Sequence, residues 1–259
     1  MKKIIILLTL ILSAFSLYAQ DALSLMKTAR QRTKIDGMEA ISTLVIRDAK
    51  GRTRTRKTAM VSRSYPNEVE KRLIRFVEPA DVKGMSMLIV DNEFEDDDMW
   101  IYIPASRQTR RIVSSEKSKS FMGSEFSNAD MAAPNLNDFS YTLLGEEKIN
   151  SEACWKIEIR PISEEKEDEY GYIRKITWIN KKDNMMIKSE YYDFDNELEK
   201  VLYIKQYDLM DKKRLSFVVI EMTIENLQSG RSSDMTMDKV LHNPDVPERY
   251  FTPSYMEQP

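Results

Sequence analysis

Histidine and cysteine are the side chains that most often act as bases, nucleophiles or metal ligands, and this chain has one of each. His242 stands in a His-Asn-Pro context typical of a loop, whereas Cys154 precedes Trp155 in a run typical of a strand. No Gly-x-Ser-x-Gly motif accompanies the distant histidine, so Ser–His and Cys–His chemistry are both disfavoured. We predict no catalytic residues, and we expect Cys154 to be a small buried side chain without a disulfide partner.

Carboxylates are the other groups that could do chemistry. Asp91–Asp98 holds six acids in eight positions, but as a calcium loop it lacks the glycine at position six and a correctly placed closing glutamate. We favour a solvated hairpin tip, with metal binding as the alternative. Glu164–Glu169, with five acids in six positions, predicts another exposed turn. The seven glycines form no phosphate-binding arrangement, so we expect neither a cofactor nor a metal.

The N-terminus has the pattern of a secretory signal peptide. Met1-Lys2-Lys3 is basic, and Ile4–Leu12 is apolar apart from one threonine. This run is too short to cross about 30 Å of hydrocarbon. We predict a signal peptide at residues 1–19 that is cleaved after Ala19, with a cut after Ser16 as the alternative. No cysteine adjoins the cut, so we expect an exported, soluble protein without a lipid anchor.

The remaining chain, residues 20–259, is predicted to be a single domain. The formal net charge is −3 with Lys2 and Lys3 and becomes −5 without them, and acidic and basic residues are mixed along the chain. This balance favours solubility and gives no electrostatic reason to expect nucleic acid or an anionic membrane as the partner. A chain of this length can bury a core without disulfides.

From residue 40 onward the sequence reads as strand after strand with short connections. Turn residues separate the segments, as at Asp48-Ala49-Lys50-Gly51 between the two arms of a hairpin. Connections this short leave no room for crossover helices, so the strands form an antiparallel meander. The predicted strands cover residues 40–46, 52–61, 69–76, 85–90, 99–103, 109–113, 139–145, 154–160, 170–180, 185–192, 200–207, 216–226 and 232–240.

Helices are few. Asp21 can cap a helix over residues 22–34, and the capping-box spacing of Ser127 and Asp130 predicts a second, short helix. A third is expected around residues 247–250. Such short helices cannot cover so many strands as a full layer. They fit either a half-barrel with a lid or a closed barrel with a plug.

Alternation along the strands gives each one an apolar face and a wetter face. We expect the apolar faces of three strands to be covered by something other than water, although a bulge of one residue would invert the choice of face. Their residues are Met85, Met87 and Ile89; Trp155, Ile157 and Ile159; and Val218, Ile220 and Met222.

One stretch carries a more specific pattern. It reads Phe76-x-x-Pro79, Gly84, Trp100-x-Tyr102-x-Pro104, Arg110-Arg111-Ile112 and Phe121-Met122-Gly123-Ser124-x-Phe126-Ser127-x-x-Asp130. This pattern resembles the outer-membrane lipoprotein-sorting protein family, a branch of the Lol-type periplasmic carrier superfamily often found beside large lipid exporters. The resemblance extends loosely along the rest of the chain. It implies a mainly β fold, namely one strongly curved antiparallel sheet (a half-barrel of about eleven strands) with a few short helices as a lid over an apolar concave face.

The resemblance also suggests where a ligand would bind. The nine apolar strand residues named above become candidate walls of a lipid-binding groove, and Phe121, Met122, Gly123 and Phe126 become a candidate lid, with simple packing as the alternative for this segment. Sixteen methionines suit an adaptable groove, though each can equally be core filler. For Arg110-Arg111 we favour a solvated face or an intramolecular acidic partner, such as the loop Asp96–Asp98, over a lipid headgroup.

Three functions follow as hypotheses. The leading one is a non-catalytic periplasmic carrier or chaperone that binds the acyl chains of lipoproteins or other lipids and ferries them toward the outer membrane. The second is an accessory binding module of an inner-membrane lipid exporter or envelope complex, and the third is a hydrolase using acidic residues. The expected partners are lipoprotein or lipid acyl chains and, as a further candidate, such an exporter. We expect a monomer with only transient membrane contact.

Overall fold

The computed structural model describes residues 22–66, 69–92 and 97–258. The predicted signal peptide at residues 1–19 and both of its cut sites lie outside the described residues, and so do residues 93–96 of the acidic segment. The described chain contains a thirteen-stranded sheet. Its strands are β1 (Gly37–Arg47), β2 (Thr53–Ser64), β3 (Val69–Glu78), β4 (Ser86–Asn92), β5 (Asp98–Ile103), β6 (Gln108–Arg111), β7 (Phe139–Ile149), β8 (Glu152–Pro161), β9 (Arg174–Asn180), β10 (Met186–Tyr192), β11 (Leu198–Asp211), β12 (Ser216–Asn226) and β13 (Arg231–His242).

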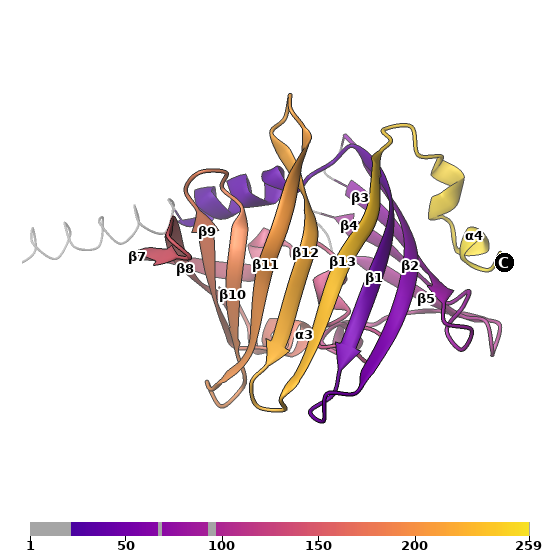
Figure 1. Ribbon diagram of the computed structural model, residues 1–259, viewed down its shortest axis with the longest axis horizontal. Helices are drawn as coiled ribbons and strands as arrows, with labels where there is room; N and C mark the ends of the chain where they lie inside the picture. The colour runs from indigo at the N-terminus through magenta and orange to yellow at the C-terminus, as the bar shows by residue number, and fades with distance from the viewer. Residues whose placement is uncertain (1–21, 67–68, 93–96, 259) are drawn as a thin grey trace, which may run out of the picture.

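The sheet is antiparallel and strongly curved, as Figure 1 shows. Its strand order is β6-β5-β4-β3-β2-β1-β13-β12-β11-β10-β9-β8-β7, so the first and last strands pair in the middle and β6 and β7 form the two edges. The sheet is not closed, which selects the half-barrel over the closed barrel. The mainly β half-barrel is confirmed, with thirteen strands rather than about eleven.

The strand order has a direct consequence for the segment at residues 112–138. Because β6 and β7 are consecutive in the chain but lie at opposite edges, this segment must cross from one edge of the sheet to the other. We call it the crossing segment. It contains three short helices, α2 (Ser114–Lys117), η1 (Ala129–Met131) and η2 (Leu136–Asp138).

The helices predicted from the sequence form close to their expected positions. Residues 22–32 are helical, close to the predicted 22–34. Ser127 and Asp130 form the predicted capping box: the Ser127 N–H donates to Asp130 Oδ2 at 2.7 Å, and the Asp130 N–H donates to Ser127 Oγ at 3.1 Å. The helix they start, η1, is a single 3₁₀ turn. Near the C-terminus η3 (Glu248–Phe251) follows as predicted, and α4 (Pro253–Met256) comes directly after it.

The prediction of an exposed turn at Glu164–Glu169 is wrong. This stretch forms α3 (Glu164–Tyr170), which begins after Ser163, whose side chain accepts a hydrogen bond from the Lys166 N–H. Glu169 is buried. The acids in the first turn of α3 interact favourably with the positive end of the helix dipole. The acid-rich composition alone did not indicate that this run forms a helix.

Each face of the sheet packs against different parts of the chain. The helix at residues 22–32 and the crossing segment pack on the concave face and contribute Ala29, Phe121 and Phe126 to the main core. On the convex face, Phe251 and Met256 from the C-terminal helices cover β3 and β4. Figure 1 shows α4 outside the curved sheet. Cys154, as expected, is buried and unpaired, in a small convex-face cluster.

Candidate functional site

The elements on the concave face leave parts of it uncovered, and cavities remain there. The edge cavity, about 250 Å³, lies between β3–β6 and the crossing segment. The central cavity, about 280 Å³, lies over β1, β2, β12 and β13. The tyrosine cavity, about 270 Å³, lies over β9–β12 beside the helix at residues 22–32. The central and tyrosine cavities share Thr33, Asp130, Ala132, Val219 and Met222, so they are neighbouring parts of one groove.

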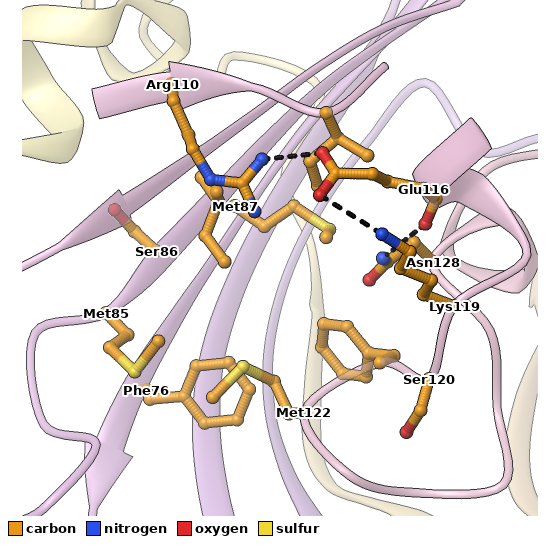
Figure 2. Close-up of a pocket in the computed structure, with 13 residues that line it drawn as sticks. Phe76, Met85, Ser86, Met87, Arg110, Glu116, Lys119, Ser120, Met122 and Asn128 are labelled. Carbon is orange, nitrogen blue, oxygen red and sulfur yellow. Dashed lines mark hydrogen bonds and ion pairs between the residues drawn. The ribbon is translucent and has the colours of Figure 1, made fainter. Parts of the chain in front are cut away.

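The edge cavity has an apolar side and a charged side. Figure 2 shows Met85, Phe76 and Met122 together, with Arg110 and Glu116 away from them. Arg110 donates to Glu116 at 2.6 Å, and this guanidinium holds the pKa of Glu116 below its ordinary value. Arg111 pairs with Asp98. Both arginines therefore have carboxylate partners within the chain, which is the interpretation favoured from the sequence.

The Phe-Met-Gly-Ser motif forms a tight turn between the edge and central cavities. The Phe121 N–H donates to the Phe126 carbonyl at 2.7 Å, and Met122 and Gly123 both have positive φ, of 55° and 80°. Glycine adopts this conformation without strain, whereas methionine rarely does. Phe121 lines both cavities and lies 5.7 Å from Phe76, ring centre to ring centre. Two separate parts of the sequence pattern, the Phe76 and Phe121 motifs, therefore meet here.

An ion pair and two hydrogen bonds fix this turn to β13. Arg231 binds Glu125 at 2.8 Å and donates to the Gly123 carbonyl at 2.8 Å, while the Glu125 N–H donates to Ser233 Oγ at 3.0 Å. Glu125 is buried. The turn is thus attached to the middle of the sheet by one ion pair, one charge-assisted hydrogen bond and one neutral hydrogen bond.

Methionines line the central cavity. Met60, Met222, Met235 and Met237 extend from β2, β12 and β13 and lie beside Val218. Thioether side chains are flexible and polarisable, so such a wall can adapt to apolar ligands of different shape. Its few polar groups include the Ser42–Thr58 hydroxyl pair, whose oxygens are 2.6 Å apart.

A buried polar network holds the far part of the crossing segment against the sheet. Asp91 on β4 binds Arg30 at 3.3 Å and accepts a hydrogen bond from the Ala133 N–H at 2.7 Å. Arg72 on β3 donates to the Met131 carbonyl at 2.6 Å. Asp91 is therefore no part of a solvated hairpin tip, and that prediction is wrong for this residue. Its burial raises its pKa, against the opposing effect of Arg30.

The tyrosine cavity contains a lysine among apolar and aromatic side chains. Lys175 on β9 lies with its ammonium 5.5 Å from the centre of the Tyr172 ring and 5.4 Å from that of Tyr191. Burial lowers the pKa of Lys175 to about 8, partly opposed by Asp130. The remaining lining is mainly apolar and comes from Met26, Ala29, Phe126, Met185, Met186, Leu202, Ile204, Val219, Met222 and Ile224.

The structure brings some of the predicted groove residues to these cavities and places others elsewhere. Met85, Met87, Phe121 and Met122 line the edge cavity, Phe121, Val218 and Met222 line the central one, and Phe126 and Met222 line the tyrosine cavity. Ile89, Ile157 and Ile159 are buried in the main core, and Ile220 packs against it. Trp155 is half-buried beneath the ammonium of Lys181, and Gly123 is exposed.

Lys175, Tyr172 and Tyr191 were missed from the sequence. On β9, Lys175 and Thr177 alternate with Ile176 and Trp178, a pattern that indicates a wet face opposite an apolar one. Both faces are in fact covered, because Ile176 and Trp178 form part of the convex-face cluster with Cys154. Lys175 lies opposite Ile159, so the two side chains are on the same, concave face. That register is not visible in the sequence, which is why Lys175 was missed.

Within residues 22–66, 69–92 and 97–258, no group of three or more His, Cys, Asp or Glu side chains is arranged so that it could hold a metal ion. Over the same ranges, no helix has both the length and the apolar character needed to span a bilayer.

Solved structures share this fold over nearly the whole chain. An outer membrane lipoprotein-sorting protein domain from Vibrio parahaemolyticus has a TM-score of 0.85 at 24% identity, covering 93% of this chain and 100% of that one. A DUF1329 family protein from Desulfovibrio piger has a TM-score of 0.84 at 27% identity, with 92% and 99% covered. A LolA superfamily protein from Nitrosomonas europaea has a TM-score of 0.70 at 21% identity, with 90% and 98% covered.

Sequence comparison assigns the chain to a family. No protein with a curated description matches it. A family model described as "Uncharacterized protein" matches residues 68–258, which include the crossing segment and β13. The resemblance drawn from the Trp100 and Phe121 motifs is confirmed by the structural neighbours. The chain belongs to the family described by that model, and it has the fold of the outer membrane lipoprotein-sorting, DUF1329 and LolA superfamily proteins.

Proposed function

We propose that this protein is a non-catalytic periplasmic carrier that shelters the acyl chains of a lipoprotein or another lipid in the groove formed by the central and tyrosine cavities. The observation that carries the proposal is the unfilled, methionine-rich concave face beneath the crossing segment. The described relatives support it, since one is named as a lipoprotein-sorting domain and another as a LolA superfamily protein.

The physical basis is the cost of exposing hydrocarbon to water. Burying one CH₂ group is worth about 0.8 kcal/mol, so a palmitoyl chain exposed in an aqueous compartment costs roughly 12 kcal/mol. Each cavity alone is near the lower limit of about 300–1,000 Å³ for ligand pockets. The central and tyrosine cavities are adjacent, and their methionine walls can shift, so one acyl chain can extend through both.

Mass spectrometry of the native protein tests the proposal. The mature protein is secreted from its host, purified without detergent and examined for bound lipid, and the affinity for a palmitoylated peptide is measured by fluorescence. We expect bound lipid and a measurable affinity. Met222→Glu places a charge where the two cavities meet and should abolish both. Met222→Trp fills the same space without charge and should weaken binding.

The control variant carries the same charge elsewhere. Leu241→Glu on β13 changes a side chain that is 59% exposed and lines no cavity described above, so binding should be unchanged. Circular dichroism establishes that each variant is folded. A folded wild-type protein with neither co-purified lipid nor affinity for acylated peptide would refute the carrier role and favour the accessory module of an exporter complex.

A further inference from the structure

Three polar side chains in the tyrosine cavity have no hydrogen-bonding partner. The ammonium of Lys175 and the hydroxyls of Tyr172 and Tyr191 make neither a hydrogen bond nor an ion pair with any residue in the described part of the chain. The two rings lie edge to face at 5.3 Å, and both are at least nine-tenths buried. Lys175 itself is half-buried, and an ammonium among apolar and aromatic side chains is disfavoured unless a counter-charge is close.

The carboxylate that lines the same cavity does not provide that counter-charge. Asp130, on the crossing segment, lines the same cavity but forms no ion pair with Lys175 within 4.0 Å. Asp130 Oδ2 instead accepts hydrogen bonds from the Ser127 N–H at 2.7 Å and the Ser127 hydroxyl at 2.9 Å. Asp130 is also exposed to solvent, which screens its charge. Lys175 therefore keeps an open position for an anion.

We propose that Lys175, with Tyr172 and Tyr191, binds the anionic group of an acyl ligand whose hydrocarbon chain lies along the methionine wall. This inference rests on the proposed carrier function and adds the ligand class: a lipid with a carboxylate or phosphate next to a single chain. The ammonium supplies the charge, and the two phenol hydroxyls are donors within the same cavity. The adjoining side chains Met186, Leu202 and Ile204 then contact the chain.

The charge of Lys175 makes this binding pH-dependent. The groups facing it are Tyr170, Tyr172 and Tyr191, Asp130 from the crossing segment, and Glu199 and Lys200 at the adjoining small cavity. Burial raises the pKa of all three tyrosines, so they remain neutral at pH values where Lys175 titrates. The pKa of free Lys175, about 8, must rise when an anion binds. Affinity for an anion therefore falls as the pH rises above about 8.

The test compares ligands that differ only in the head. Palmitate, palmitoyl lysophosphatidate and hexadecanol are titrated into the full mature protein at about pH 7 and about pH 10. Wild type should bind the anions about 10- to 100-fold more tightly than the alcohol at the lower pH, with a smaller preference at the higher one. The tighter of the two anions distinguishes a carboxylate from a phosphate source.

Variants assign the effect to the site. Lys175→Met should remove the preference for anions and its pH dependence while leaving hexadecanol affinity intact. Asp130→Asn keeps an acceptor for Ser127, removes a negative charge and should tighten palmitate binding. The control is Lys156→Met, the same substitution on the convex face of the neighbouring strand β8. It should leave the preference for anions and its pH dependence unchanged.

The outcomes separate the two proposals. If wild type binds all three ligands alike, or if Lys175→Met retains the preference, the anion site is refuted and the carrier function stands. If wild type binds none of the ligands, both proposals fail.

Discussion

Asp97 shows how a single carboxyl group can make the stability of this protein depend on pH. Its Oδ1 accepts a hydrogen bond from the Asn92 N–H at 3.0 Å. Burial, followed by repulsion from Asp91, raises the pKa of Asp97 to about 7. At pH values between the ordinary pKa of an aspartate and about 7, Asp97 therefore keeps its proton in the folded chain and releases it in the unfolded chain. Consequently, this group makes the free energy of unfolding fall as the pH rises through that window.

Asp97→Asn should remove this fall. We expect urea unfolding of the wild type to show a lower free energy of unfolding at about pH 8 than at about pH 5, with a smaller difference in the variant. Asp208→Asn changes an exposed carboxyl group and serves as the control. Equal pH dependence in wild type and Asp97→Asn would contradict the assignment.

At the scale of elements, the crossing segment is tied to α3 by a buried ion pair. Lys117 on α2 and Glu169 on α3 are 2.5 Å apart, with side chains 7% and 4% exposed. Lys166 also binds Glu169, at 2.9 Å. Burial alone would raise the pKa of Glu169, but the two ammonium groups hold it below its ordinary value. This contribution to stability is present above the ordinary pKa of the group and is lost as the pH falls.

Glu169→Gln should lower the free energy of unfolding by about 3 kcal/mol near neutral pH, because it leaves Lys117 buried without a counter-charge. Glu165→Gln, on an exposed face of the same helix, should cost less than about 0.5 kcal/mol. Chemical denaturation of both variants checks the difference. A loss in Glu169→Gln no larger than in Glu165→Gln would show that the pair contributes nothing.

The elements were largely predictable, because turn residues and alternation are local signals. The thirteen strand segments inferred from residues match the thirteen strands, whereas the family resemblance implied about eleven. What alternation could not indicate is which strands are covered on both faces. Lys175 was therefore missed. Ile157 and Ile159, which the sequence suggested as groove residues, lie in the packed core. Glu169 was misjudged because an acid-rich run does not reveal a lysine that is distant in sequence.

For the molecule as a whole, the two faces of the sheet are packed differently. The convex face of β3 and β4 is sealed by Val246, Phe251 and Met256, which are at most 5% exposed. The concave face keeps the cavities. Stability and ligand binding should therefore respond to different substitutions.

Phe251→Ala should lower the free energy of unfolding by about 3–5 kcal/mol, because it leaves a cavity in the convex-face cluster. Under conditions where the variant remains folded, its affinity for palmitoylated peptide should equal that of the wild type. Denaturation and fluorescence titration measure the two quantities. A parallel loss of affinity would mean that the two faces are coupled.

The pairing of β1 with β13 has a consequence for how the chain acquires its shape. Met38 lies opposite His242, so the central ladder joins residues at opposite ends of the polypeptide. Until β13 has been synthesised, β1 has only β2 as a neighbour, and the half-finished sheet exposes a row of unpaired backbone groups at its centre. Contacts this distant in sequence also form slowly. The chain therefore completes its fold only once its last strand has joined its first.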